Sequence, residues 1–178
     1  ADDIRTGKID TNLPEFETAE AAVKAQLDAF VSNNGTHTVD YYHKKLGKIM
    51  WVKCGMSRNT KGLNEAISEI KALREDFYKN VKVPGTTSEF NPELAKAARV
   101  ADFLELGELF AKDALERNES CGGHFREESQ TPEGEALRDD KNFTFVSAWE
   151  YKGEPAKAQL HKEQLNYEEI EVKTRSYK

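Results

Sequence analysis

The stretch NPELAKAARVADFLELGELFAKDALERNE (91–119) decides the fold class of this chain, because it carries a complete set of helix signals. Asn91 belongs to the residue types that cap helix N-termini, Pro92 suits the first helical position, and Glu93 favours the positive end of the helix dipole. The sequence CGG ends the pattern directly after Ser120. This stretch therefore predicts one long helix that runs to about Glu119.

Three further helices are predicted upstream, where apolar residues recur at steps of three and four. The first begins near Pro14 and stops at NNG (33–35), the second is capped by Thr38, and the third starts near Thr60. Long amphipathic helices with short connections predict an antiparallel bundle. The predicted apolar faces are Phe16, Ala19, Val23, Leu27 and Phe30 in the first helix, Val39, Tyr42, Leu46, Ile49, Met50 and Met56 in the second, and Leu63, Ala66, Ile67, Ile70, Leu73 and Phe77 in the third.

The last third of the chain has a different character. The segment 126–142 is polar, contains Pro and Gly, and indicates a long loop. The segment 143–151 is aromatic and β-favouring, and 159–172 alternates in part between apolar and polar residues, so these two segments could pair as strands. We therefore expect a mainly α protein. Its antiparallel bundle, of three-helix, spectrin-repeat-like form with an added N-terminal helix, would span 14–121, and an extended tail with short β segments would span 122–178.

Composition excludes several classes of function. The 178 residues include 26 basic and 32 acidic side chains, and a net charge of −6 argues against a nucleic-acid-binding protein. No apolar run approaches the roughly 20 residues needed to span a bilayer. The two cysteines fit a reducing compartment better than a disulfide framework. The glycine-rich fingerprints for dinucleotides and for nucleotide phosphates are absent, as are the serine-hydrolase elbow and the H-E-x-x-H zinc motif.

One short stretch concentrates reactive side chains. ESCGGHFREE (119–128) holds a thiol, an imidazole, a guanidinium and three carboxylates. A zinc site at Cys121 and His124 would need two further ligands, and the other candidates are scattered singly along the sequence. The acidic residues of the following loop could be imagined as an acid/base pair, but a solvated loop is the commoner case. The residues alone therefore predict no catalytic, cofactor-binding or metal-binding side chains in this chain. The scattered metal-ligand candidates are Cys54, His37, His43 and His161.

Several segments together resemble a known family, and the resemblance covers residues 10 to 178. The chain is similar to the C-terminal region of the flavoprotein subunit of succinate dehydrogenase and fumarate reductase, in the branch outside the mitochondrial type. The segments that carry the resemblance are LGKIMWVKCGMSRN (46–59), GLNEAISEIKALREDF (62–77), ARVADFLELGELFAKDALERNESCGGHFREESQTPEGEALRDDKNF (98–143), SAWEY (147–151), LHKE (160–163) and RSYK (175–178).

This resemblance implies an enzyme that interconverts succinate and fumarate, with electrons passing through flavin adenine dinucleotide (FAD) to an iron–sulfur subunit and a quinone. In the family, the flavin and the dicarboxylate are bound by upstream domains whose motifs do not occur here. We therefore expect a piece of the enzyme with no cofactor of its own, and residues 1–13 as a remnant of the upstream flavin domain. The family also implies a place at the cytoplasmic face of the bacterial inner membrane, with the membrane anchor subunit as an indirect partner.

The resemblance also implies that ESCGGHFREE (119–128) is a candidate interface. A long polar loop keeps its order only if something fixes it, so we expect this segment to dock on the flavin domain or on the iron–sulfur subunit. Arg126 could pair there with a carboxylate. Mitochondrial-type members have Arg where this chain has Cys121, so an anion-clamping role inferred from that Arg does not transfer. The candidate interface residues are His124, Phe125, Arg126, Glu127 and Phe143.

Two other interpretations remain open at this point. The chain could be a free-standing helical module whose tail recruits a partner protein, which a long upstream reading frame would exclude. A small metalloenzyme that uses Cys121 and His124 is a weaker hypothesis, which elemental analysis would test.

Overall fold

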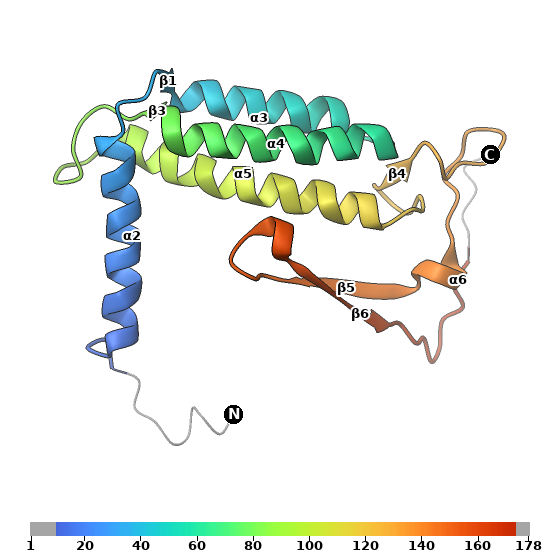
Figure 1. Cartoon of the computed structure of the whole chain (residues 1–178). Coiled ribbons are helices and arrows are strands. Elements are labelled where there is room, and N and C mark those ends of the chain that lie inside the picture. Colours follow the sequence, from blue (N-terminus) through green and yellow to red (C-terminus); the bar gives the residue numbers. More distant parts are fainter. Residues whose placement is uncertain (1–9, 174–178) are drawn as a thin grey trace.

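Three long helices lie side by side and form the body of the protein (Figure 1). The computed structural model describes residues 10–173. Helix α4 (Thr60–Asn80) runs antiparallel to α3 (Val39–Lys53) and α5 (Pro92–Glu116), as the short connections require. The prediction of a mainly α protein is confirmed.

Polar side chains begin each of these helices, as the sequence indicates. The Asn91 side chain accepts a hydrogen bond from the backbone N–H of Leu94 at 3.0 Å, and Thr38 caps α3 in the same way through Tyr41 N–H at 3.3 Å. Each cap satisfies one of the backbone N–H groups that a helix N-terminus leaves without a partner. The end of α5 is predicted less well, because the helix stops at Glu116 rather than near Glu119.

The core lies between α3, α4 and α5, and the predicted apolar faces supply most of it. In the face predicted for the second helix, Met56 departs from the pattern: it is 89% exposed, because α3 ends at Lys53 before it. The largest apolar side chains that are fully buried are Val39, Tyr42, Leu63, Ile70, Phe77, Val81 and Leu104.

Helix α2 (Pro14–Ser32) stands across one end of the bundle instead of packing along it (Figure 1). Only Phe30 is buried, and its ring meets Phe77 edge-on with centroids 5.5 Å apart. Phe16 and Val23, which the sequence pattern places on an apolar face, are about half exposed. The 3.6-residue period therefore predicts this helix correctly but not the burial of its face within the described chain.

Two pairs of very short parallel strands tie loops to the bundle. β1 (His37–Thr38) pairs with β3 (Val81–Lys82), next to the ends of α2 and α4. β2 (Ser57–Arg58) pairs with β4 (Phe125–Arg126), so the segment that follows α5 is fixed to the connection between α3 and α4.

The tail contains a β-hairpin that lies against α5 (Figure 1). A short helix, α6 (Asp140–Phe143), leads into β5 (Phe145–Glu150), which pairs antiparallel with β6 (Gln159–Gln164). The predicted pairing of these two segments is confirmed, with the 3₁₀ turn η1 (Pro155–Lys157) between them. Contacts from α5 hold the hairpin: Trp149 Nε1 donates to Asp113 at 2.8 Å, Lys112 Nζ donates to the Ala158 carbonyl at 3.1 Å, and Lys162 pairs with Glu116 at 2.8 Å.

Candidate interface at the end of helix α5

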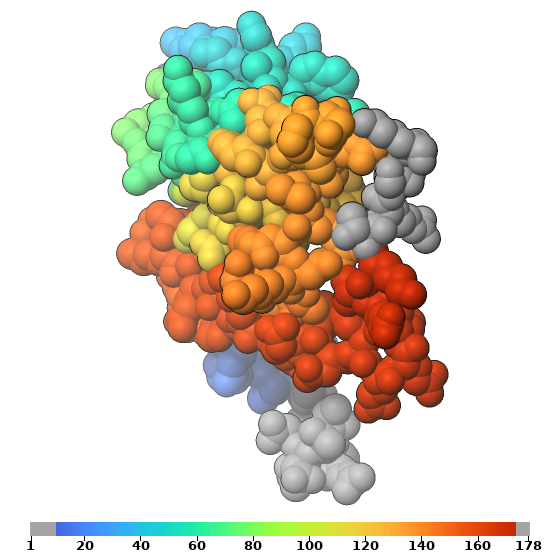
Figure 2. All heavy atoms as spheres, turned by 90° about the vertical axis from the view of Figure 1, so that its right-hand side faces the viewer, coloured from blue at the N-terminus to red at the C-terminus, as the bar shows by residue number. Residues whose placement is uncertain are grey.

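The candidate interface segment folds back over the end of α5, where it covers the end of the bundle (orange in Figure 2). Cys121 and His124 exchange both backbone hydrogen bonds, at 2.9 and 3.1 Å, and close a tight turn. Gly122, inside this turn, has a φ of 60°, a left-handed conformation that glycine adopts without strain. The CGG sequence is therefore a reversal of the chain, which brings the next residues back to α5.

Arg126 is the centre of the contacts that this turn creates. Its side chain is only 1% exposed. Nη1 donates to the carbonyl oxygens of Ala114 at 2.9 Å and Leu115 at 3.2 Å, in the last turn of α5. Nη2 donates to Thr60 Oγ1 at 2.8 Å, at the start of α4. One guanidinium thus satisfies carbonyl groups that the end of α5 leaves without helical partners and joins them to a second helix.

This position changes the expectation for Arg126. The sequence predicts that its guanidinium pairs with a carboxylate of a partner, whereas the structure shows it buried in its own bundle. The reason is geometric, because the reversal at Gly122 directs the side chain back toward the end of α5. The chain itself therefore supplies contacts that fix this part of the long polar segment.

The two carboxylates after Arg126 hold the start of α4. Glu127 accepts hydrogen bonds from Ser57 Oγ and Asn59 Nδ2, both at 2.8 Å, and these bonds lower the pKa of its carboxyl group. Glu128 accepts a hydrogen bond from the backbone N–H of Thr60 at 2.6 Å and contacts Arg126 Nε at 3.2 Å. Burial alone would raise the pKa of Glu128, but the bonds from Thr60 and the Arg126 charge lower it to about 2. Negative charge at this helix N-terminus also suits the helix dipole.

His124 has both ring nitrogens engaged. Arg58 Nη1 lies 2.7 Å from Nδ1, and Nε2 lies 2.7 Å from the Arg117 carbonyl oxygen. Because an arginine can only donate, Nδ1 accepts, and the ring is neutral with its proton on Nε2. Burial lowers the pKa of His124, and the positive charges of Arg58, Arg126 and Arg117 lower it as well. His124 therefore joins two segments of the chain. Within residues 10–173, no cluster of His, Cys, Asp and Glu has the geometry of a metal site.

Phe143 belongs to an aromatic cluster around Arg117. The Arg117 guanidinium lies over the rings of Phe143 and Phe145, at 5.6 and 4.9 Å from their centroids. It also donates to the carbonyl oxygens of both residues and pairs with Glu119 at 2.6 Å. Cation–π contacts of this kind fasten the start of the hairpin to the end of α5.

The candidate interface residues thus fall into two groups. Arg126 and His124 act inside the chain, while Phe125 and Phe143 are half-buried and Glu127 is exposed. Sequence reasoning missed Arg58 and Arg117, which complete the arrangement. Their partners lie far along the chain, as with Arg58 and His124, which are 66 positions apart, so no local pattern indicates them.

The fold and these contacts define a class of protein: a helical module whose tail is bound back onto the end of its last helix. Among residues 10–173, no helix combines the length and apolar character needed to cross a membrane. A model of the fumarate reductase flavoprotein C-terminal family matches residues 43–177, and this chain belongs to that family.

Individual relatives agree with this assignment. The fumarate reductase flavoprotein subunit of Escherichia coli (strain K12) is 30% identical over 132 residues, which cover 74% of this chain and 21% of the relative. An L-aspartate oxidase of Nostoc sp. is 30% identical over 128 residues, covering 65% of this chain and 22% of the oxidase. A solved E. coli quinol fumarate reductase shares the fold, with a TM-score of 0.77 at 24% identity over 93% of this chain and 27% of that one. The chain thus spans about a fifth of the length of the curated relatives it matches.

Proposed function

We propose that the intact protein is a flavoprotein oxidoreductase that interconverts succinate and fumarate. The observation that carries this proposal is the family match over residues 43–177, together with the 30% identity to the E. coli fumarate reductase flavoprotein. In such enzymes the flavin supplies the redox chemistry, and the protein supplies binding and orientation. We assign FAD to the part of the protein upstream of this chain, with electrons passing to an iron–sulfur subunit and a quinone. The complex would lie at the cytoplasmic face of a bacterial inner membrane through its anchor subunit.

Within that enzyme, we propose that residues 10–173 serve structure and assembly. The charged side chains at the end of α5 are used to hold the tail of the chain itself, as the contacts of Arg126 and Arg117 illustrate. Outside this framework lie partly exposed side chains that suit a docking surface on the flavin domain or the iron–sulfur subunit. They are Phe125, Glu127, Leu137 and Phe143. Arg126 and His124 would support this surface from beneath.

The enzymatic proposal is tested with the protein encoded by the complete reading frame. We expect it to bind FAD, to oxidise succinate and to reduce fumarate with artificial electron carriers. L-Aspartate is assayed in parallel because a relative is an L-aspartate oxidase. Turnover of L-aspartate but not of succinate or fumarate would contradict the proposal. The 178-residue chain, purified alone, should show neither flavin absorbance nor turnover.

The assembly proposal is tested by Leu137→Asp, because Leu137 is 49% exposed and lies within the candidate surface. In the intact complex this change should reduce the amount of assembled enzyme on a native gel. The melting temperature of the 178-residue chain should stay unchanged, because no buried side chain is removed. Val146→Asp, on the exposed side of the hairpin, is the matched control. Normal assembly of the Leu137 variant would show that this surface does not dock.

A further inference from the structure

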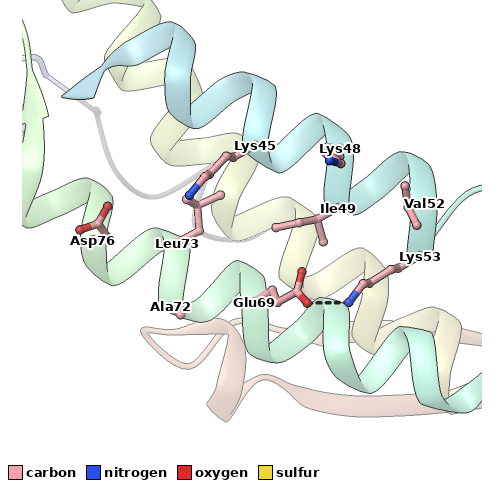
Figure 3. Close-up of a pocket in the computed structure, with 9 residues that line it drawn as sticks. All are labelled: Lys45, Lys48, Ile49, Val52, Lys53, Glu69, Ala72, Leu73 and Asp76. Carbon is pink, nitrogen blue, oxygen red and sulfur yellow. Dashed lines mark hydrogen bonds and ion pairs between the residues drawn. The ribbon is translucent and has the colours of Figure 1, made fainter.

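A groove of about 510 Å³ runs between α3 and α4 (Figure 3), and its lining includes none of the candidate interface residues. Its middle is apolar, with Ile49 and Val52 on α3 opposite Ala72 and Leu73 on α4. Val52 is 62% exposed, so part of this apolar surface is in contact with water. The volume lies within the range of about 300–1,000 Å³ that is typical of small-molecule sites.

The two ends of the groove differ in charge. At one end Lys53 is closed off by two ion pairs, with Glu65 at 2.8 Å and Glu69 at 2.5 Å. Toward the other end, where Asp76 lies, Lys45 and Lys48 stand one helical turn apart on α3 and are exposed (Figure 3). Neither has a carboxylate within 4.0 Å among residues 10–173.

Asp76 lines this end of the groove, and hydrogen bonds from Asn80 and Tyr42 lower the pKa of its carboxyl group, so it stays charged. Asp76 accepts hydrogen bonds from Tyr42 Oη at 2.8 Å and Asn80 Nδ2 at 2.6 Å. Lys45 also lies over the ring of Tyr41, with Nζ 4.7 Å from the ring centroid. Two cations and one carboxylate thus border this part of the apolar surface, so positive charge prevails there.

We propose that this groove binds a free anionic amphiphile, with the acid group between Lys45 and Lys48 and the apolar body along Ile49, Val52 and Leu73. The apolar surface favours a ligand with a hydrocarbon portion, because a purely polar anion would leave that surface wet. The two unpaired lysines favour a negative head group over a neutral or cationic one. This inference does not depend on the proposed enzymatic function.

The probe is monomeric dodecanoate, titrated into the 178-residue chain by calorimetry below its micelle concentration. We expect saturable binding to one site. Dodecyltrimethylammonium, which has the same tail and the opposite charge, and acetate, which has the head group without the tail, should each bind at least about tenfold more weakly. The double substitution Lys45→Gln with Lys48→Gln should weaken dodecanoate binding by about tenfold or more, and Lys45→Arg with Lys48→Arg should retain it.

Two further variants serve as controls. Lys61→Gln with Lys79→Gln removes the same charge from exposed positions of α4 outside the groove and should leave dodecanoate binding unchanged. Val52→Asp should weaken binding of dodecanoate while circular dichroism shows an unchanged helix content. The proposal is wrong if dodecanoate does not saturate, if the Lys45/Lys48 glutamine variant binds as tightly as the original chain, or if the cationic detergent binds equally well. Binding to phosphatidylglycerol vesicles without binding of monomeric dodecanoate would also overturn it, in favour of a lipid surface.

Discussion

Replacing Arg126 by Ala should destabilise the bundle itself. The side chain is 1% exposed and donates hydrogen bonds to two carbonyl oxygens of α5 and to Thr60 on α4. Hydrogen bonds to a charged group contribute about 1.5–3 kcal/mol each, and their contributions are not additive. Removal of the guanidinium also leaves buried carbonyl groups without partners. We therefore expect Arg126→Ala to lower the free energy of unfolding by about 3–5 kcal/mol.

The assay is urea unfolding of the 178-residue chain, followed by far-ultraviolet circular dichroism. Arg126→Lys keeps a positive charge but loses the planar fork, so its loss should be smaller, at about 1–3 kcal/mol. Arg99→Ala is the control, because Arg99 is an exposed residue of α5, and surface changes of this kind stay within about 0.5 kcal/mol. A loss below about 1 kcal/mol for Arg126→Ala would refute the reasoning from burial. If that variant also failed to assemble into the complex, Arg126 would act at a partner surface instead.

Three further outcomes are expected. Because burial lowers the folded-state pKa of His124, its contribution to stability should be complete above its ordinary pKa of about 6.5 and should decline as pH falls below that value. Urea unfolding should therefore give a lower free energy of unfolding at pH 5.5 than at pH 7.5, and His124→Gln should reduce this difference. An unchanged difference in the variant would contradict the assignment. Gly35→Ala should destabilise the chain by about 1–3 kcal/mol, because a Cβ would lie 2.0 Å from the Asn80 carbonyl oxygen. Gly47→Ala, on the open side of α3, should instead stabilise it by about 0.5–1 kcal/mol. Equal effects of the two substitutions in thermal unfolding would rule out the close approach at Gly35. Trp149→Ala removes the hydrogen bond to Asp113 of α5, so it should speed amide hydrogen exchange in β5 and β6 but not in the three bundle helices. Val146→Ala, on the exposed side of the hairpin, should have no such effect.

Local chemistry in the sequence determined the helices and most of their buried faces. Asn91 and Thr38 cap helices because a side-chain oxygen satisfies a neighbouring backbone N–H, a relation that spans only three residues. The apolar period of α4 predicts its buried face for the same reason, since residues three and four apart lie on one side of a helix. The family resemblance also followed from the sequence, because it rests on residue types and spacings along the chain.

Only the tertiary structure decided how the tail and the charged residues are used. The burial of Arg126 depends on the reversal at Gly122, which brings its guanidinium to α5 and to Thr60, 66 positions away. The half-exposed face of α2 and the unpaired lysines at the α3–α4 groove depend equally on which helices become neighbours. The 3.6-residue period of apolar residues indicates which face of a helix can be buried. The packing of distant segments decides which surface covers that face. Stable packing must bury apolar area and also give every buried polar group a hydrogen-bond partner.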